Sequence, residues 1–380
     1  LPVVDPRNQR RHLDLLLRRG EAECRAGHRS DARATFREAA TLAQSLGASP
    51  ELARAALGMA PGFLAAEAGV VDPTLEELLA KAMASLGASD SRLKAQIAAR
   101  LAMALHWSES DARMHELIDR ARRFLRQDPD PCVELHVLLA EWFCEWSPGE
   151  GARRATIADQ ICGLAQELCD REMYLLGTML RLVSMLEHSQ ISGFDVALAS
   201  FESLAEHLRQ PQSLWYASMY KAMRSLLDGN FEQAREFQGV YSKIAGRVGD
   251  ANAFHSLAAQ TALLHWESGG LDTMLEAIAE GARRYPAIRG FRAGLAWALA
   301  KTGRDQEAEC EFANIAANNF RDVPSRYDWS TAIAFAADTC AHLRDHSHAQ
   351  VLYKILEPLQ GQMLVLGLGV ASYGSADRLL

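Results

Sequence analysis

The chain has 380 residues, 49% of them hydrophobic and 7% aromatic, and a formal net charge of −8 at pH 7. This hydrophobic fraction is enough for a continuous core, while the acidic balance argues against a nucleic-acid surface, because phosphate binding needs clustered positive charge. The longest uncharged stretch, from Gln360 to Asp377, carries four glycines. We therefore expect neither a membrane span nor direct nucleic-acid contact.

The first predicted helix pair carries a spacing that returns along the chain. Gly27 is followed after five residues by Ala32, and Ala32 after four by Phe36. In an antiparallel helix pair the glycine closes the turn, the alanine lets the backbones approach, and the aromatic fills the groove to the next pair. Ala-x-x-x-Phe is the second-helix half of the tetratricopeptide pattern.

Helix-breaking residues then occur at intervals that predict helices of about 10 to 18 residues. Asp72 and Pro73 predict a helix start, with the aspartate as N-cap and the proline in the first turn. The least regular stretches are Ala60–Val71 and Gly361–Gly374. Because no long polar linker appears and the first residue is not Met, we expect residues 1–380 to be a single continuous domain of a longer protein.

The spacing recurs in the second half of the chain. Gly303, Ala308 and Phe312 repeat it in full. Partial copies are Gly229 with Ala234, Ala197 with Phe201, and Ala349 with Tyr353. Ala197 and Ala234 are 37 residues apart, a distance typical of helix-turn-helix solenoids. We predict an all-α, tetratricopeptide-like right-handed α-solenoid of about eight antiparallel helix pairs, without a sheet. The alternative is an irregular helical bundle in which such pairs recur by chance.

No glycine motif predicts a cofactor. A phosphate loop needs a Gly-Lys pair, and the chain has none. The run Met363–Gly369, with Gly374, departs from the dinucleotide fingerprint because its third glycine comes too late in the sequence. We expect these glycines to let a connecting turn pass close to the last helices.

Metal and catalytic motifs are not evident either. His342, His346 and His348 lie near Asp345 but lack a second ligand cluster, so a solvated turn is favoured over a metal site. A hydrolase with a hidden site is an open alternative without a supporting motif. The seven cysteines are scattered, which fits a reduced, cytoplasmic setting.

Aromatic residues and arginines give the strongest candidates for binding. Trp215 and Tyr216 begin a predicted first helix, Arg224 follows on the same helix, and Arg181 lies on the preceding first helix. Since first helices line the concave wall of a solenoid, we predict that these four residues bind a protein partner or a small effector. The alternative is that Trp215 is buried between repeats and Arg224 pairs with Asp228. The wider aromatic set is Trp107, Trp142 and Trp146.

Several segments of the sequence resemble those of a known protein family. Leu204–Pro211, Trp215-Tyr216, Ala222–Gly229, Gly249–Asn252 and the closing Gly369–Leu380 resemble the C-terminal helical-repeat region of bacterial multidomain signal-transduction (STAND-type) ATPases. This family includes LuxR-type transcriptional regulators and ATPase-linked nucleotide cyclases. The resemblance implies a non-catalytic sensor or protein-interaction arm of an ATP-dependent regulator, with the ATPase module as one partner. The alternative is a stand-alone tetratricopeptide scaffold or peptide-binding adaptor.

Overall fold

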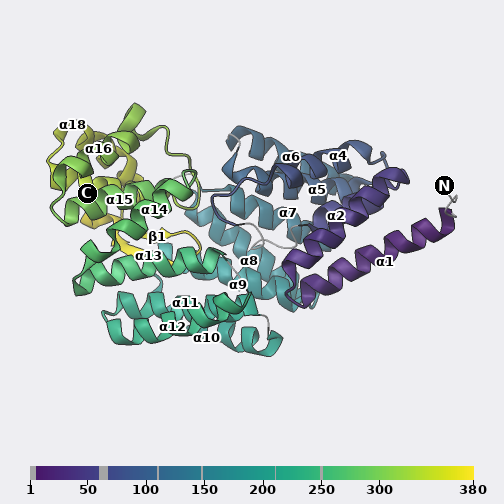
Figure 1. Cartoon of the computed structure of the whole chain (residues 1–380), viewed down its shortest axis with the longest axis horizontal. Coiled ribbons are helices and arrows are strands. Elements are labelled where there is room, and N and C mark those ends of the chain that lie inside the picture. Colours follow the sequence, from purple (N-terminus) through teal and green to yellow (C-terminus); the bar gives the residue numbers. More distant parts are fainter. Residues whose placement is uncertain (1–5, 60–66, 109–110, 147–148, 210, 249–250) are drawn as a thin grey trace. The chain divides into compact units, whose positions relative to one another are not determined.

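The computed structural model describes residues 6–59, 67–108, 111–146, 149–209, 211–248 and 251–380 (Figure 1). These residues form 18 α-helices and one two-stranded antiparallel sheet, so the prediction of an all-α helical-repeat fold is confirmed apart from that sheet. The chain forms two compact units, residues 1–144 and 145–380, and each is described by itself. Across the described residues, none of the helices is long and apolar enough to cross a membrane.

The first unit is built from helix hairpins. Helix α1 packs on α2 and α5 on α6, while α1, α3, α5 and α7 also contact one another in succession. Phe36 of α2 is buried, and an added Cβ at Gly20 or Gly58 would lie within 2.8 or 2.4 Å of its ring. The aromatic ring thus fills the groove between α1 and α3, as its spacing predicts. The helices of this unit are α1 (Pro6–Arg25), α2 (Arg29–Ser45), α3 (Ser49–Gly58), α4 (Pro73–Ser85), α5 (Ser91–Ala104), the 3₁₀-helix η2 (Leu105–Trp107), α6 (Asp111–Gln127) and α7 (Pro131–Cys144).

Several predicted turns and helix caps are present in the described residues. The Asp72 side chain accepts a hydrogen bond from the Leu75 N–H at 3.0 Å and caps α4. Gly27, Gly229 and Gly303 have φ of +82°, +73° and +76°, the left-handed backbone that a tight turn after a helix requires. The first part of the irregular stretch, residues 60–66, lies outside the described residues.

The second unit continues the helix pairs. Its helices are α8 (Gly151–Glu167), α9 (Arg171–Glu187), α10 (Ile191–Leu208), α11 (Pro211–Leu227), α12 (Phe231–Val248), α13 (Ala251–Ser268), α14 (Leu275–Arg284), α15 (Arg289–Lys301), α16 (Asp305–Ala316), α17 (Trp329–Leu343) and α18 (His346–Leu356). Short 3₁₀-helices are η3 (Leu271–Met274), η4 (Ala317–Phe320), η5 (Glu357–Leu359) and η6 (Ala376–Arg378).

The repeat spacing is only partly reflected in the burial of this unit. Ala308 and Phe312 are buried as predicted. The assignment of Ala349 and Tyr353 to a packed groove is wrong, because Tyr353 is 47% exposed and Leu352 and Leu356 carry the core contact of α18.

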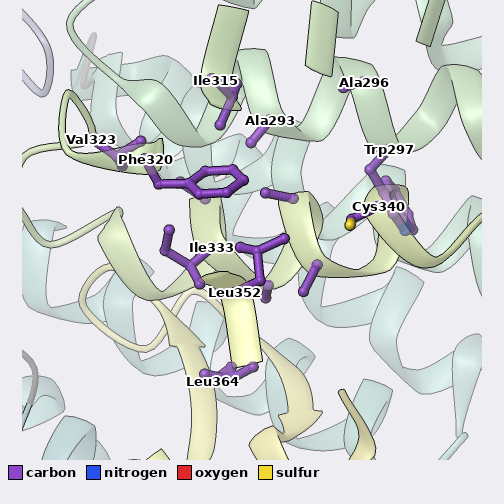
Figure 2. Packing of buried hydrophobic residues seen from close by; sticks show 14 of the residues in the cluster. Ala293, Ala296, Trp297, Ile315, Phe320, Val323, Ile333, Cys340, Leu352 and Leu364 are labelled. Atoms are coloured by element: carbon purple, nitrogen blue, oxygen red, sulfur yellow. The ribbon is translucent and has the colours of Figure 1, made fainter. Parts of the chain in front are cut away.

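A β-hairpin follows the last helix pair and corrects the expectation of a sheet-free chain with a simple connecting turn. Strand β1 (Met363–Leu366) pairs antiparallel with β2 (Ala371–Ser375). Leu364 of β1 joins the core cluster that contains Ile333 and Leu352 (Figure 2). A four-residue apolar run bounded by glycines does not distinguish a strand from a turn by periodicity, which explains the miss.

Candidate functional site

The hairpin lies along the first helices of the pairs in the second unit, the wall on which the sequence places the binding site. Both strands approach helices: β1 contacts α9 and α17, and β2 contacts α11. Tyr220 of α11 donates to the Leu368 carbonyl at 2.9 Å, and Ser330 of α17 to that of Val365 at 2.8 Å. Side chains of the helices therefore bind main-chain carbonyls of the hairpin, Val365 on β1 and Leu368 in the turn.

Gln260 of α13 is the most connected of these side chains. It is fully buried, and its Nε2 donates to the carbonyls of Val370 at 2.7 Å and Met219 at 3.0 Å. Its Oε1 accepts from the Tyr241 hydroxyl at 2.9 Å. One amide thus joins α11, α12, α13 and the hairpin.

Two turn glycines allow the close approach of the hairpin. Gly367 and Gly369 have φ of +55° and +81°. An added Cβ would lie 2.9 Å from the Tyr327 ring at Gly367 and 2.8 Å from the Tyr220 ring at Gly369. The glycines thus allow a close approach, as expected, but only Gly367 lies near the last helices, whereas Gly369 lies against α11.

Beside β1 is a small pocket of about 30 Å³ within the second unit. Its polar side chains are Arg154, Glu187, Arg326, Ser330 and Gln362, of which the first three are buried. Its remaining lining residues are Trp146, Gly149, Gly151, Trp329, Leu359, Met363 and Leu364. With two guanidinium groups and one carboxylate, the lining has a formal charge of +1.

Arg154 is held firmly at this pocket. Its Nη2 lies 2.6 and 2.7 Å from the two carboxylate oxygens of Glu187, and its Nη1 donates to the Glu145 carbonyl at 2.9 Å. The guanidinium carbon lies 4.6 Å from the centre of the Trp146 ring, a cation–π contact. Its Nε makes no hydrogen bond.

A buried carboxyl group stands next to the pocket. Asp328 accepts a hydrogen bond from the Gly290 N–H at 2.8 Å and is 2% exposed. Burial raises the pKa of Asp328 to about 6, against the opposing effects of that hydrogen bond and of the charge on Arg326. This carboxyl group therefore changes charge in the mildly acidic range.

The structure brings together two of the four predicted binding residues. Trp215 and Tyr216 stack with ring centres 3.8 Å apart, and both are buried, at 0% and 4% exposure. Tyr216 lies 6.3 Å, ring centre to ring centre, from Tyr220, which binds the hairpin. Trp215 and Tyr216 thus belong to the buried aromatic cluster of Tyr220, the residue that contacts the hairpin.

The two predicted arginines each face carboxylates. Arg181 Nε lies 2.5 Å from Asp159 Oδ1. Arg224 Nε lies 2.8 Å from Asp195 Oδ1, and its Nη1 also pairs with Asp228. Hydrogen bonds from Arg224 to Asp228 and then Asp195 raise the pKa of Arg224 above its usual range. The burial of Trp215 and the Arg224–Asp228 pair match the alternative for these residues; binding by them stays a prediction.

Sequence reasoning missed most of the pocket. Trp146 stands in the predicted aromatic set, but Arg154, Glu187 and Arg326 come from three distant segments and give no local motif. A tryptophan followed after eight residues by an arginine was the available signal, and helix-rich sequences carry many such pairs.

The histidine-rich turn has ordinary partners. His342 lies 2.9 Å from Asp305, and His348 lies 2.5 Å from Asp345, the residue that caps α18. In the part of the chain that the structure describes, no group of three or more His, Cys, Asp or Glu side chains is arranged to hold a metal ion.

Comparison with known proteins identifies the architecture. No protein-family model matches the sequence, and no curated protein sequence matches it. The structure is similar to the crystal structure of a Rap protein complexed with competence and sporulation factor, with a TM-score of 0.64, 13% identity, and coverage of 92% of this chain and 97% of that one.

A second similar structure is that of aspartyl phosphate phosphatase F from Bacillus subtilis. Its TM-score is 0.52 at 13% identity, with 92% of this chain and 94% of that chain covered. At such identity the likeness concerns the fold, and it extends over nearly the whole chain.

Proposed function

We propose that this chain is a non-catalytic, tetratricopeptide-like module that binds a peptide or an extended segment of a partner protein. The observation that carries the proposal is the chemistry of its first helices. Tyr220, Gln260 and Ser330 donate side-chain hydrogen bonds to three main-chain carbonyls of one segment, which here is the chain's own hairpin. Such recognition of the main chain is how helical and sheet-edge receptors gain affinity for peptides.

The pocket beside the hairpin extends this wall with side chains typical of binding hot spots. Arg154 and Arg326 supply buried guanidinium groups, and Trp146 and Trp329 supply rigid aromatic surface. One of the proteins with a similar fold was crystallised with competence and sporulation factor. This supports a binding role for the shared architecture and leaves the ligand of this chain to experiment.

An array of immobilised nonapeptides with free C-terminal carboxylates tests the proposal. We expect the full chain to bind a subset of them, and Arg326→Gln to weaken that binding about tenfold or more through loss of a charge-assisted contact. Arg321→Gln, an exposed arginine on the preceding turn, is the matched control and should bind as the wild type does. If no peptide is retained, or if Arg326→Gln retains the same peptides equally well, the pocket does not bind peptides.

A second candidate function rests on the resemblance of runs such as Ala222–Gly229 and Gly369–Leu380 to repeat regions of signal-transduction ATPases. In this proposal the chain is the cytoplasmic sensor arm of an ATP-dependent bacterial regulator of transcription. Ligand binding would then shift an ATPase between states for which the ligand has different affinity. Reading the whole gene decides it: an open reading frame without an ATPase module leaves only the adaptor.

A further inference from the structure

A buried arginine in the first unit has no counter-ion among the residues that the structure describes. Arg100 lies on α5 and is 8% exposed. Its Nη1 approaches only the Met103 sulfur, at 3.9 Å, and its Nε makes no hydrogen bond. Within the described residues, no carboxylate lies within ion-pair distance of this guanidinium.

The neighbouring charges increase the imbalance. Burial, and to a smaller extent the positive charge of Arg33 on α2, lower the pKa of Arg100 to about 10. Arg33 pairs with Asp72 and also donates to the Met59 carbonyl at 3.3 Å. Arg37 acts electrostatically on the same Asp72. Arg33 and Arg37 thus both act on Asp72, which already caps α4, and Arg33 has no second carboxylate partner among the ion pairs of the described residues.

Arg100 remains positively charged at neutral pH, since a pKa near 10 is well above 7. An uncompensated buried charge is strongly unfavourable, and buried charges in proteins are almost always paired. Contact with a thioether sulfur does not replace a carboxylate, because sulfur is a weak acceptor. The planar fork of an arginine is suited to anions with two or three oxygens.

We propose that Arg100, assisted by Arg33, forms a binding site for a small oxyanion, a carboxylate or a phosphate group, in the first unit. The anion completes the charge balance that the residues described by the structure leave open. This site is separate from the pocket beside the hairpin and does not depend on the peptide-binding proposal.

Thermal unfolding of the full chain at constant ionic strength tests the site, with sodium chloride replaced stepwise by sodium phosphate or by sodium acetate. We expect one of these oxyanions to raise the wild-type Tm saturably, by about 5 °C or more. A rise with phosphate alone assigns a phosphoryl ligand, a rise with acetate alone assigns a carboxylate, and a rise with both assigns a general oxyanion site.

Arg100→Met provides the decisive variant. It removes the charge and keeps most of the volume, so its Tm in chloride should equal or exceed that of the wild type, and its oxyanion response should be absent. Arg92→Met is the matched control on the same helix, because Arg92 is half-exposed and already pairs with Asp128 and Asp130. It should keep the full response.

Two results overturn the proposal. One is an equal oxyanion response in Arg100→Met. The other is the absence of any response in the wild type to either oxyanion; a lower Tm for Arg100→Met would then make Arg100 a packing residue. If Arg100→Met does not fold, Arg100→Lys replaces it: the charge stays but the fork is lost, so the apparent affinity should fall by about tenfold. An unchanged affinity in Arg100→Lys would equally refute the site.

Discussion

Both units of the chain bury arginine side chains, and Arg154 in the second unit and Arg100 in the first have opposite surroundings. Arg154 in the second unit is 5% exposed and has Glu187, a carbonyl and an indole ring around it. Arg100 in the first unit is 8% exposed and has a thioether. Two arginines with similar burial therefore differ in their partners. Arg154 is part of a paired structural cluster, whereas the charge of Arg100 has no counter-ion among the described residues. Burial alone does not indicate a ligand; burial without a partner does.

The strongest test of this comparison is to remove the partner of Arg154. Glu187→Gln keeps the shape of the side chain and removes its charge, which leaves a buried guanidinium uncompensated. We expect the second unit to lose about 3–5 kcal/mol of unfolding free energy, measured by urea denaturation.

Glu202→Gln is the control for that measurement. Its pair with Lys221 is about one-third exposed at both side chains, so we expect a loss of about 1 kcal/mol or less. Equal losses in the two variants would show that Arg154 is as well solvated as a surface lysine, and the contrast with Arg100 would disappear.

The buried carboxyl group of Asp328, next to the pocket, has a smaller effect on stability, and this effect depends on pH. The pKa of Asp328 is about 6 in the folded chain, raised by burial, against about 3.9 for an unfolded aspartate. Between these values the folded state binds the additional proton, so this carboxyl group makes stability fall as pH rises from about 4 to 6. At about 1.4 kcal/mol per pKa unit, the effect is at most about 3 kcal/mol.

Asp328→Asn isolates this contribution, because the amide oxygen can still accept from the Gly290 N–H. The measurement is the stability of the wild type minus that of the variant across the acidic range. We expect this difference to decrease with rising pH and to level off above about 7. A flat difference would mean that the pKa of Asp328 is the same in the folded and unfolded chain, so that Arg326 and the Gly290 N–H fully offset the effect of burial.

The smallest expected effect concerns a predicted binding residue. Arg224 shares its charge between Asp195 and Asp228, and its side chain is 22% exposed. Arg224→Met should therefore change the unfolding free energy by about 1 kcal/mol or less. Binding on the nonapeptide array then separates the alternatives: lost binding at unchanged stability supports a site, while unchanged binding leaves Arg224 as a surface ion pair.

Sequence reasoning reached the fold through local features. The glycine-alanine-aromatic spacing around Phe36 and Phe312 reports contacts between adjacent helices, so it is visible in a short window. The same reasoning misplaced Tyr353, because spacing does not say which face of a helix finds a neighbour.

The sites were less accessible for a physical reason. Glu187 lies 33 residues from Arg154, and Leu368 lies 148 residues from Tyr220. Pairings at such separations depend on how the repeats stack, which periodicity does not encode. Arg100 gives no sequence signal at all, because its importance lies in the missing partner.

The hairpin also changes how the second unit should fold. A repeat array behaves as a one-dimensional chain in which each unit feels only its neighbours and can fray from an end. Hydrogen bonds from Tyr220 to Leu368 and from Gln260 to Val370 span 148 and 110 residues and tie early repeats to the last segment. Closing such long loops is entropically costly and slows folding, because the contacts form only after most of the unit is in place. Once formed, they should make the repeats lose their structure together, so the second unit should melt cooperatively like a globular domain.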